Sequence, residues 1–440
     1  NAFGKSARLH RWQVRVALHD NLLVGVLPSG TPLLGLAVDV GSTKLAAYLL
    51  NLQTGALLAK AGAMNPQIAF GEDIISRIVY ASTHQDGAQV LQARLIDSLN
   101  TLIATLCEES ATHPEQIVDA VIVGNTVMHH LLAGLPVEQL GEAPYVASTL
   151  NALALSADAL GLNTSAGARV YLPPLIAGYV GADHTAMLIA TNVATIGETC
   201  MVLDIGTNTE ITLAHGGRLM SCSCASGPAF EGAHISQGMR AAAGAIERVQ
   251  WLDGHVRITT IDNHKAIGIC GSGILDAVAV MADHHIVDAR GALNQQHPNV
   301  HEGCFVLRAD DGAGRGGVTR KDVSEVQLAK AAIRVGVELL LQEAALTAQD
   351  IDQFIIAGAF GSYITVDSAI RIGMFPALPH ERFRQVGNAA GLGACQMLLS
   401  ASHRKAAETM THHIHYVELT THPDFQTGFM NHLSLRNQEG

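Results

Sequence analysis

One short pattern occurs twice in this chain and limits how it can fold. Residues 36–51 read LAVDVGSTKLAAYLLN, and residues 201–214 read MVLDIGTNTEITLA. Each copy has an apolar run, an aspartate, one apolar residue, a glycine, two small polar residues and a second apolar run. A glycine directly after a buried strand lets backbone N–H groups approach an anion closely. The two copies therefore predict a duplicated half-domain whose two strand-turn-strand loops face one phosphate chain.

The aspartates of the two copies are Asp39 and Asp204. An aspartate near a glycine is also a common turn residue at strand ends, but two independent turns would not need the same pattern. We assign both carboxylates to Mg²⁺, through water, because magnesium keeps much of its hydration shell. The residues expected to donate to phosphate oxygens are Gly41, Ser42, Thr43, Gly206, Thr207 and Asn208.

Lys44 directly follows the first loop. Its ammonium could neutralise charge on a phosphoryl group during transfer. It could equally be a solvated lysine on the surface of a strand. The sequence leaves both interpretations open.

Composition excludes several classes of protein. The formal net charge of −12 argues against a nucleic-acid surface, which normally shows clustered Lys and Arg. No apolar stretch reaches the ~18 residues that a membrane-spanning helix needs. The seven cysteines are scattered, so they indicate neither a disulfide framework nor an iron–sulfur cluster, and we expect a reducing cytoplasm.

The length of 440 residues indicates two or three domains. We expect residues 1–34, with a strand pair in 12–26, to end an upstream module, since the chain begins with Asn1 rather than methionine. Two domains should follow, at 35–196 and 197–440. Apolar periodicity predicts strands at 118–125 and 353–361 and helices at about 72–82, 87–109, 177–190 and 323–344, with further helices opening in 226–239 and 387–401.

Two glycine-containing segments of the second half are further candidates for nucleotide contacts. CGSGILD (270–276) could present the start of a helix, whose free N–H groups suit an anion or a ribose, through Gly271, Ser272 and Gly273. Close helix packing explains the two glycines nearly as well. IIAGAFGSY (355–363) ends an apolar strand with small residues, so that a flat adenine or ribose could lie against Gly358, Ala359 and Phe360.

Taken in chain order, these elements resemble the superfamily of acetate and sugar kinases, heat-shock chaperones and actin (ASKHA). The two Asp-Gly loops look like its phosphate loops, 355–363 like its adenosine loop, and the small-residue helices at 177–190 and 387–396 like its connecting helices. The resemblance implies an α/β fold of two lobes, built from duplicated ribonuclease H-like half-domains, that closes on ATP. It also places Gly227 in a glycine-containing phosphate loop, followed by an acidic residue, Glu231, that could orient the attacking water; Glu210 is the competing candidate.

Longer strings resemble the reductive activators of corrinoid-dependent enzymes (RACo-like). They are NPQIAFGEDIISRI (65–78), GNTVMHHLLAGL (124–135), CASGPAFEGAHI (224–235), GICGSGILDAV (268–278) and EVQLAKAAIRVG (325–336). The resemblance implies ATP-driven reduction of Co(II) to Co(I) in a corrinoid protein or corrinoid-dependent methyltransferase. It also implies a [2Fe-2S] ferredoxin domain upstream of this chain, so the electron donor is expected to be that domain or another protein.

Two other functions fit the same loops. A small-molecule kinase would use the same Mg-ATP site with an acceptor in place of water. A nucleotide-dependent binding or scaffold module would bind ATP tightly with little turnover. The sequence leaves open whether the chain forms a homodimer.

Overall fold

The structure is a computed structural model. It describes residues 4, 8, 11–19, 21–71, 73–308 and 315–435. These residues form two compact units, one made of residues 1–194 and 389–414 and the other of 195–388 and 415–440. Residues 389–414 thus belong with the first unit although they follow the second along the chain. The predicted domain boundaries at 34/35 and 196/197 stay a prediction.

The first unit is built on a six-stranded sheet with the order β5-β4-β3-β6-β8-β7. Strands β3, β4 and β5 form an antiparallel meander, and β6 and then β8 add in parallel, while β7 is antiparallel at the edge. The bounds are β3 Leu34–Val40, β4 Lys44–Asn51, β5 Leu57–Met64, β6 Ile117–Gly124, β7 Leu153–Ser156 and β8 Arg169–Leu172.

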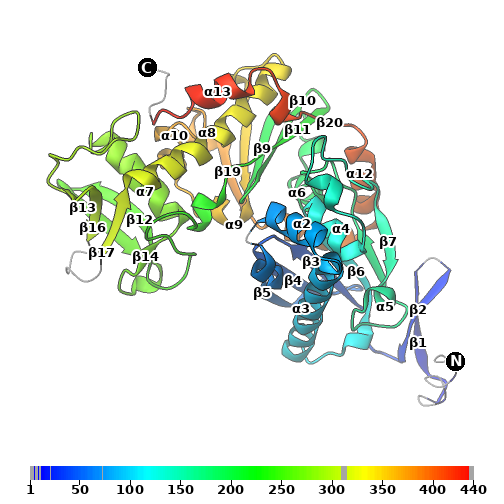
Figure 1. Ribbon diagram of the computed structural model, residues 1–440. Coiled ribbons are helices and arrows are strands. Elements are labelled where there is room, and N and C mark those ends of the chain that lie inside the picture. The colour runs from blue at the N-terminus through cyan, green and yellow to red at the C-terminus, as the bar shows by residue number, and fades with distance from the viewer. Residues whose placement is uncertain are drawn as a thin grey trace. The chain divides into compact units, whose positions relative to one another are not determined.

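Alternate residues of the central strands supply two cores, one on each face of this sheet. Leu36, Val38 and Ile122 belong to one apolar cluster, and Ala37 and Val121 belong to another. Since side chains alternate across a strand, these residues lie on opposite faces, and both faces are covered by helices, as Figure 1 shows for α2, α3, α4 and α6. The helices are α2 Ile74–Thr83, α3 Gly87–Glu109, α4 Thr126–Ala133, α5 Ala157–Leu160, α6 Ala182–Thr191, α11 Ala389–Leu399 and α12 Ala401–Thr411.

The second unit repeats the topology of the first. Its sheet has the order β19-β18-β9-β10-β11-β20, in which β9, β10 and β11 form the meander and β18 and β19 add in parallel. When only the five shared strands are numbered along the chain (β3, β4, β5, β6, β8 and β9, β10, β11, β18, β19), both sheets have the order 3-2-1-4-5, which is the duplication that the repeated Asp-Gly pattern predicts. The first sheet adds β7 beside β8, and the second adds β20 beside β11. The bounds are β9 Cys200–Ile205, β10 Thr209–His215, β11 Arg218–Cys224, β18 Gln353–Ala357, β19 Phe383–Gly387 and β20 Ile414–Tyr416.

Between β11 and β18 the second unit carries two small sheets and two long helices. The sheets are β13-β12-β14, from β12 Ala245–Leu252, β13 His255–Thr260 and β14 Gly268–Ile269, and β15-β16-β17, from β15 Val300–His301, β16 Cys304–Arg308 and β17 Arg315–Thr319. The helices of this unit are α7 Gly271–Asp283, α8 Arg320–Glu343, α9 Gly358–Gly361, α10 Val366–Arg371 and α13 Phe425–Asn431.

A hairpin precedes the first sheet. Its strands β1 Val14–His19 and β2 Leu22–Pro28 pair antiparallel, which confirms the strand pair predicted in 12–26. Ala17 and Val24 pack on Val118 at the start of β6, so the hairpin is anchored to the first unit by one of its faces.

Two predicted helices are corrected by the structure. Residues 226–239 open no α-helix: only the 3₁₀ turn Pro228–Glu231 forms there, and Gly232, with φ of 84°, ends it. The helix expected from residue 177 begins at Ala182, because Ala177 and Val180 form a β-bridge before it. Among the described residues, no helix is both long and apolar enough to cross a membrane.

Candidate functional site

The first Asp-Gly loop lies at the end of β3. Asp39 is half-buried and is the second-last residue of β3, before Val40. Gly41, Ser42 and Thr43 connect β3 to β4. The Gly41 N–H donates to the Lys44 carbonyl at 3.0 Å, and a Cβ on Gly41 would lie 2.7 Å from that oxygen. The turn is therefore tight enough to require glycine. Lys44 is exposed.

The carbonyl oxygens of Gly41, Ser42 and Thr43 all accept hydrogen bonds from other parts of the chain. Asn65, which is buried, donates from its side chain to the Gly41 carbonyl at 2.8 Å and from its backbone to the Thr43 carbonyl at 3.0 Å. The guanidinium of Arg77 donates to the Ser42 carbonyl at 2.5 Å. Among the described residues, the Ser42 N–H has no protein acceptor, so this face of the loop suits an anion.

The second Asp-Gly loop is built in the same way. The Gly206 N–H donates to the Asn208 carbonyl at 3.1 Å, and the Ser226 hydroxyl donates to the Gly206 carbonyl at 3.2 Å. The Gly227 N–H donates to the Thr207 carbonyl at 2.9 Å. In the described chain, the N–H groups of Thr207 and Asn208 have no protein acceptor. Gly227, with φ of 75°, therefore supports the loop through its backbone.

The two candidate carboxylates for water activation both lie beside this second loop. The Thr207 hydroxyl donates to Glu231, at the end of the 3₁₀ turn. Glu210 is the antiparallel partner of Asp204, so the side chains of these two residues point to the same face of the sheet. The Ser223 hydroxyl donates to Glu210 at 3.4 Å. The geometry keeps both candidates, and the assignment stays a prediction.

The predicted adenosine loop packs directly against Asp204. Gly358 has φ of 88°, and a Cβ there would lie 2.7 Å from the Ile205 carbonyl oxygen and 2.8 Å from the Asp204 Oδ1. Ala359 follows in α9. The ring of Phe360 stacks on that of Phe230, with centroids 4.7 Å apart. The second Asp-Gly loop and the predicted adenosine loop thus form one cluster within the second unit.

The start of α7 joins the same cluster through close packing. A Cβ on Gly271 would lie 1.9 Å from the Phe230 carbonyl oxygen, and one on Gly273 would lie 2.1 Å from that of Ile246. Both glycines are thus required by backbone approach, which was the alternative to an anion or ribose contact. The Ser272 hydroxyl is buried and lies 3.5 Å from the Cys270 sulfur.

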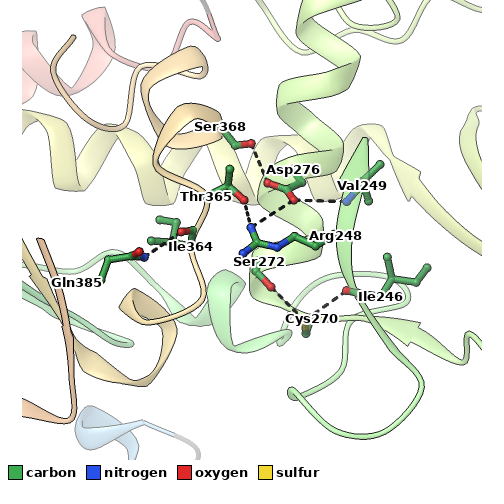
Figure 2. A network of polar contacts seen from close by, with 10 residues as sticks. All are labelled: Ile246, Arg248, Val249, Cys270, Ser272, Asp276, Ile364, Thr365, Ser368 and Gln385. Atoms are coloured by element: carbon green, nitrogen blue, oxygen red, sulfur yellow. Dashed lines mark hydrogen bonds and ion pairs between the residues drawn. The ribbon is translucent and has the colours of Figure 1, made fainter. Parts of the chain in front are cut away.

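A buried carboxylate that the sequence did not single out fixes this helix. Figure 2 shows Asp276, one turn after Gly273, at the centre of a polar network. It accepts from the Ser368 hydroxyl at 2.7 Å and lies 3.9 Å from the Arg248 guanidinium, which in turn donates to Thr365. Burial raises the pKa of Asp276 above its ordinary value, while these partners oppose that shift. The network ties α7 to β12 and α10.

Other candidate metal ligands do not come together. Among the described residues, no group of three or more His, Cys, Asp or Glu side chains could hold a metal ion. Cys222 and Cys224 are buried in β11, and burial raises the pKa of both thiols.

Residues 198–440 match the family described as the C-terminal domain of RACo, the ASKHA domain, and residues 34–195 match the RACo middle region. The chain belongs to the RACo family. This confirms the α/β ASKHA fold that the two Asp-Gly loops predicted.

Three relatives of this family are similar over most of the chain. The corrinoid activation enzyme RamQ of Eubacterium limosum is 33% identical over 95% of this chain and 73% of its own length. A Co(II) methylated amine-specific corrinoid protein reductase of Methanosarcina barkeri is 26% identical over 84% of this chain and 70% of its own. A solved structure of a reductive activator for corrinoid, iron–sulfur protein is 33% identical, covers 98% of this chain and 72% of its own, and has a TM-score of 0.87.

Proposed function

We propose that this RACo-family chain is an ATP-dependent reductive activator of a corrinoid protein or corrinoid-dependent methyltransferase. It would couple ATP binding and hydrolysis to the reduction of Co(II) to Co(I). The observation that carries the proposal is the agreement between similarity to corrinoid activators over nearly the whole of this chain and two loops whose carbonyl oxygens all accept hydrogen bonds from the protein.

Each group of site residues would have its own role in binding and hydrolysing ATP. N–H groups of the two loops would bind phosphate oxygens, and Asp39 and Asp204 would hold the hydrated Mg²⁺. When bound, Mg²⁺ would neutralise charge that develops on the phosphates. Glu231 or Glu210 would orient water for attack on the terminal phosphorus, giving ADP and phosphate. The segment around Gly358 and Phe360 would hold the adenosine.

Coupling needs two nucleotide-dependent states. Reduction of Co(II) to Co(I) is very unfavourable, so it must be linked to a second process, and ATP can bias a conformational equilibrium only by the difference in its affinity for the two states. A corrinoid protein that binds these states differently must change the affinity for ATP by the same factor. The electron itself would come from a [2Fe-2S] ferredoxin domain or protein outside this chain.

The test titrates ATP into the chain with and without Co(II) and methyl-Co(III) corrinoid proteins. An added electron donor is included, and formation of Co(I) is followed by absorbance. We expect ATP affinity to differ between the two corrinoid states and Co(I) to form only with ATP. Glu231→Gln and Glu210→Gln are compared in the same assay, and the variant that loses hydrolysis while retaining ATP affinity identifies the water-orienting residue.

Other outcomes would support the rival functions. Stoichiometric appearance of a phosphorylated small molecule would indicate a kinase. Tight ATP binding with hydrolysis that no corrinoid protein changes would indicate a scaffold. Either result would overturn the activator proposal.

A further inference from the structure

Arg77 is a buried cation directly behind the first Asp-Gly loop. It lies in α2, its side chain has no exposed surface, and it donates to the carbonyl oxygens of Ser42 at 2.5 Å and Gly71 at 3.0 Å. Its remaining contacts are the Gln67 side-chain oxygen at 3.5 Å and the Met128 sulfur at 3.6 Å. All four partners are neutral.

No carboxylate forms an ion pair with this guanidinium in the described part of the chain. Among the described residues, Asp73 is the acidic group that raises the pKa of Arg77, but the Asp73 carboxylate accepts from the Ser76 N–H as the cap of α2. Burial outweighs this effect and lowers the pKa of Arg77 to about 10. A buried charge without an ionic partner is costly, so a partner that arrives later would be bound more strongly.

The Ser42 carbonyl links this charge to the loop. Because Arg77 holds that oxygen inward, the backbone is fixed directly after the Ser42 N–H, which has no protein acceptor among the described residues. Asn65 fixes the peptides on either side in the same way. An anion on the outer side of the loop would therefore meet a preorganised donor, the Ser42 N–H, with a positive charge behind it.

We propose that Arg77 is a positioning residue for the first phosphate loop, and that the anion bound on that loop supplies a charge partner that the described residues of the chain do not. The inference rests on the proposed nucleotide function and deepens it: it names the residue that makes the loop selective for a polyphosphate over an uncharged nucleoside. Among its described contacts, the second loop has no such cation behind it. Its carbonyl oxygens accept instead from the Ser226 hydroxyl and the Gly227 N–H.

Arg404 offers a matched control. It also lies in the first unit, it is mostly buried, and it donates to a backbone carbonyl, that of Met397, at 2.7 Å. Unlike Arg77 it has an ionic partner, Asp119, at 2.6 Å. In the pairing of β3 with β6, Asp119 lies opposite Gly35, and Gly124 lies opposite Val40, next to the loop. At the rise of a β-strand, the ion pair of Arg404 with Asp119 is therefore about 16 Å from the loop, at the opposite end of the strands.

The experiment measures the affinities of Mg-ATP and of adenosine by calorimetry for the full chain and for Arg77→Lys, Arg77→Gln and Arg404→Gln. We expect Arg77→Gln to weaken Mg-ATP binding at least about tenfold and to change adenosine binding less than about twofold. Arg77→Lys, which keeps the charge but not the fork, should fall between. Arg404→Gln should lower Tm without changing the ratio of the two affinities.

The possible results distinguish a failure of the role of Arg77 from a failure of the proposed nucleotide function. A wild-type chain that prefers Mg-ATP to adenosine, with an Arg77→Gln variant that keeps the same preference, overturns the inference alone. An Arg77→Lys variant as weak as Arg77→Gln overturns the role of the charge. If Arg77→Gln does not fold, Arg77→Lys is compared with the wild type, and a loss of Mg-ATP affinity of about tenfold or more in Arg77→Lys overturns it. A wild-type chain that binds adenosine and Mg-ATP equally would overturn the phosphate loops themselves and this inference with them.

Discussion

Replacing Gly358 by alanine should damage both the stability of the second unit and its candidate site. Gly358 has φ of 88°, a conformation that costs an L residue about 1–2 kcal/mol. The added Cβ would also lie 2.7 Å from the Ile205 carbonyl oxygen and 2.8 Å from the Asp204 Oδ1. Overpacking of this kind costs about 1–3 kcal/mol, so we expect a total loss of about 2–5 kcal/mol in the free energy of unfolding.

Gly254 separates the two contributions. Its φ is 81°, in the same region, but a Cβ there would meet nothing within 4 Å. Gly254→Ala should therefore cost only the conformational part, about 1 kcal/mol after the gain from a less flexible unfolded chain. The difference between the two variants measures the approach of the adenosine loop to Asp204.

Urea unfolding gives the stability of each variant, and calorimetric titration gives its affinity for Mg-ATP. Gly358→Ala should lose Mg-ATP affinity because the Asp204 carboxylate must move away from the new methyl group, whereas Gly254→Ala should bind as the wild type does. Equal stabilities for the two variants, or wild-type affinity in Gly358→Ala, would refute the reasoning.

Three further predictions concern chemistry, iron content and pH. Asp39→Asn and Asp204→Asn should each slow ATP hydrolysis at least about tenfold, about 1.4 kcal/mol of barrier, whereas Asp97→Asn, on the exposed face of α3, should not; equal turnover in all three would remove the two aspartates from the site. The purified chain should be colourless and bind no stoichiometric iron, since its cysteines are scattered, and two irons and two sulfides per chain would contradict this. Burial lowers the pKa of Lys330 to about 7, so between pH 7 and its unfolded value of 10.5 the unfolded state binds more protons, and stability should rise with pH by about 1 kcal/mol per unit near pH 8. Lys330→Met should abolish this rise in a series of urea titrations, and a slope that persists in the variant would argue against the assignment.

The sequence predicts the fold of this chain well where the information is local. The Asp-Gly pattern alone indicates two strand-turn-strand units, and the observed sheets repeat one strand order. Helix 87–109 is predicted with its observed bounds, because a long amphipathic segment leaves little ambiguity. The helix expected in 226–239 is wrong because Gly227 and Gly232 both take positive φ and the chain turns instead.

The buried polar contacts that hold the candidate site in place could not be predicted from the sequence, for a physical reason. Arg77 lies in a string that carried the family resemblance, but its contact with Ser42 joins residues 35 positions apart, and no local pattern announces such a contact. Asp276 is similar: its partner Ser368 is 92 positions away. A charged residue inside an apolar helical face was the available signal, and burial in the folded chain was needed to interpret it.

The return of residues 389–414 to the first unit matters for a chain that is made from its N-terminus. The face of the first sheet that carries Ala37 and Val121 is completed by Ala394 and Met397 of α11, and Gly393 packs so tightly on Ala186 that a Cβ would lie 1.9 Å from its carbonyl oxygen. At about 5–20 residues per second, some tens of seconds of translation separate the end of residues 1–194 from the arrival of α11. Throughout that interval this apolar face of the sheet is covered by α6 but lacks α11, which completes the cover. Synthesis of this protein should therefore depend on a chaperone that binds the nascent first unit, or on a folding order in which the second unit closes before the first.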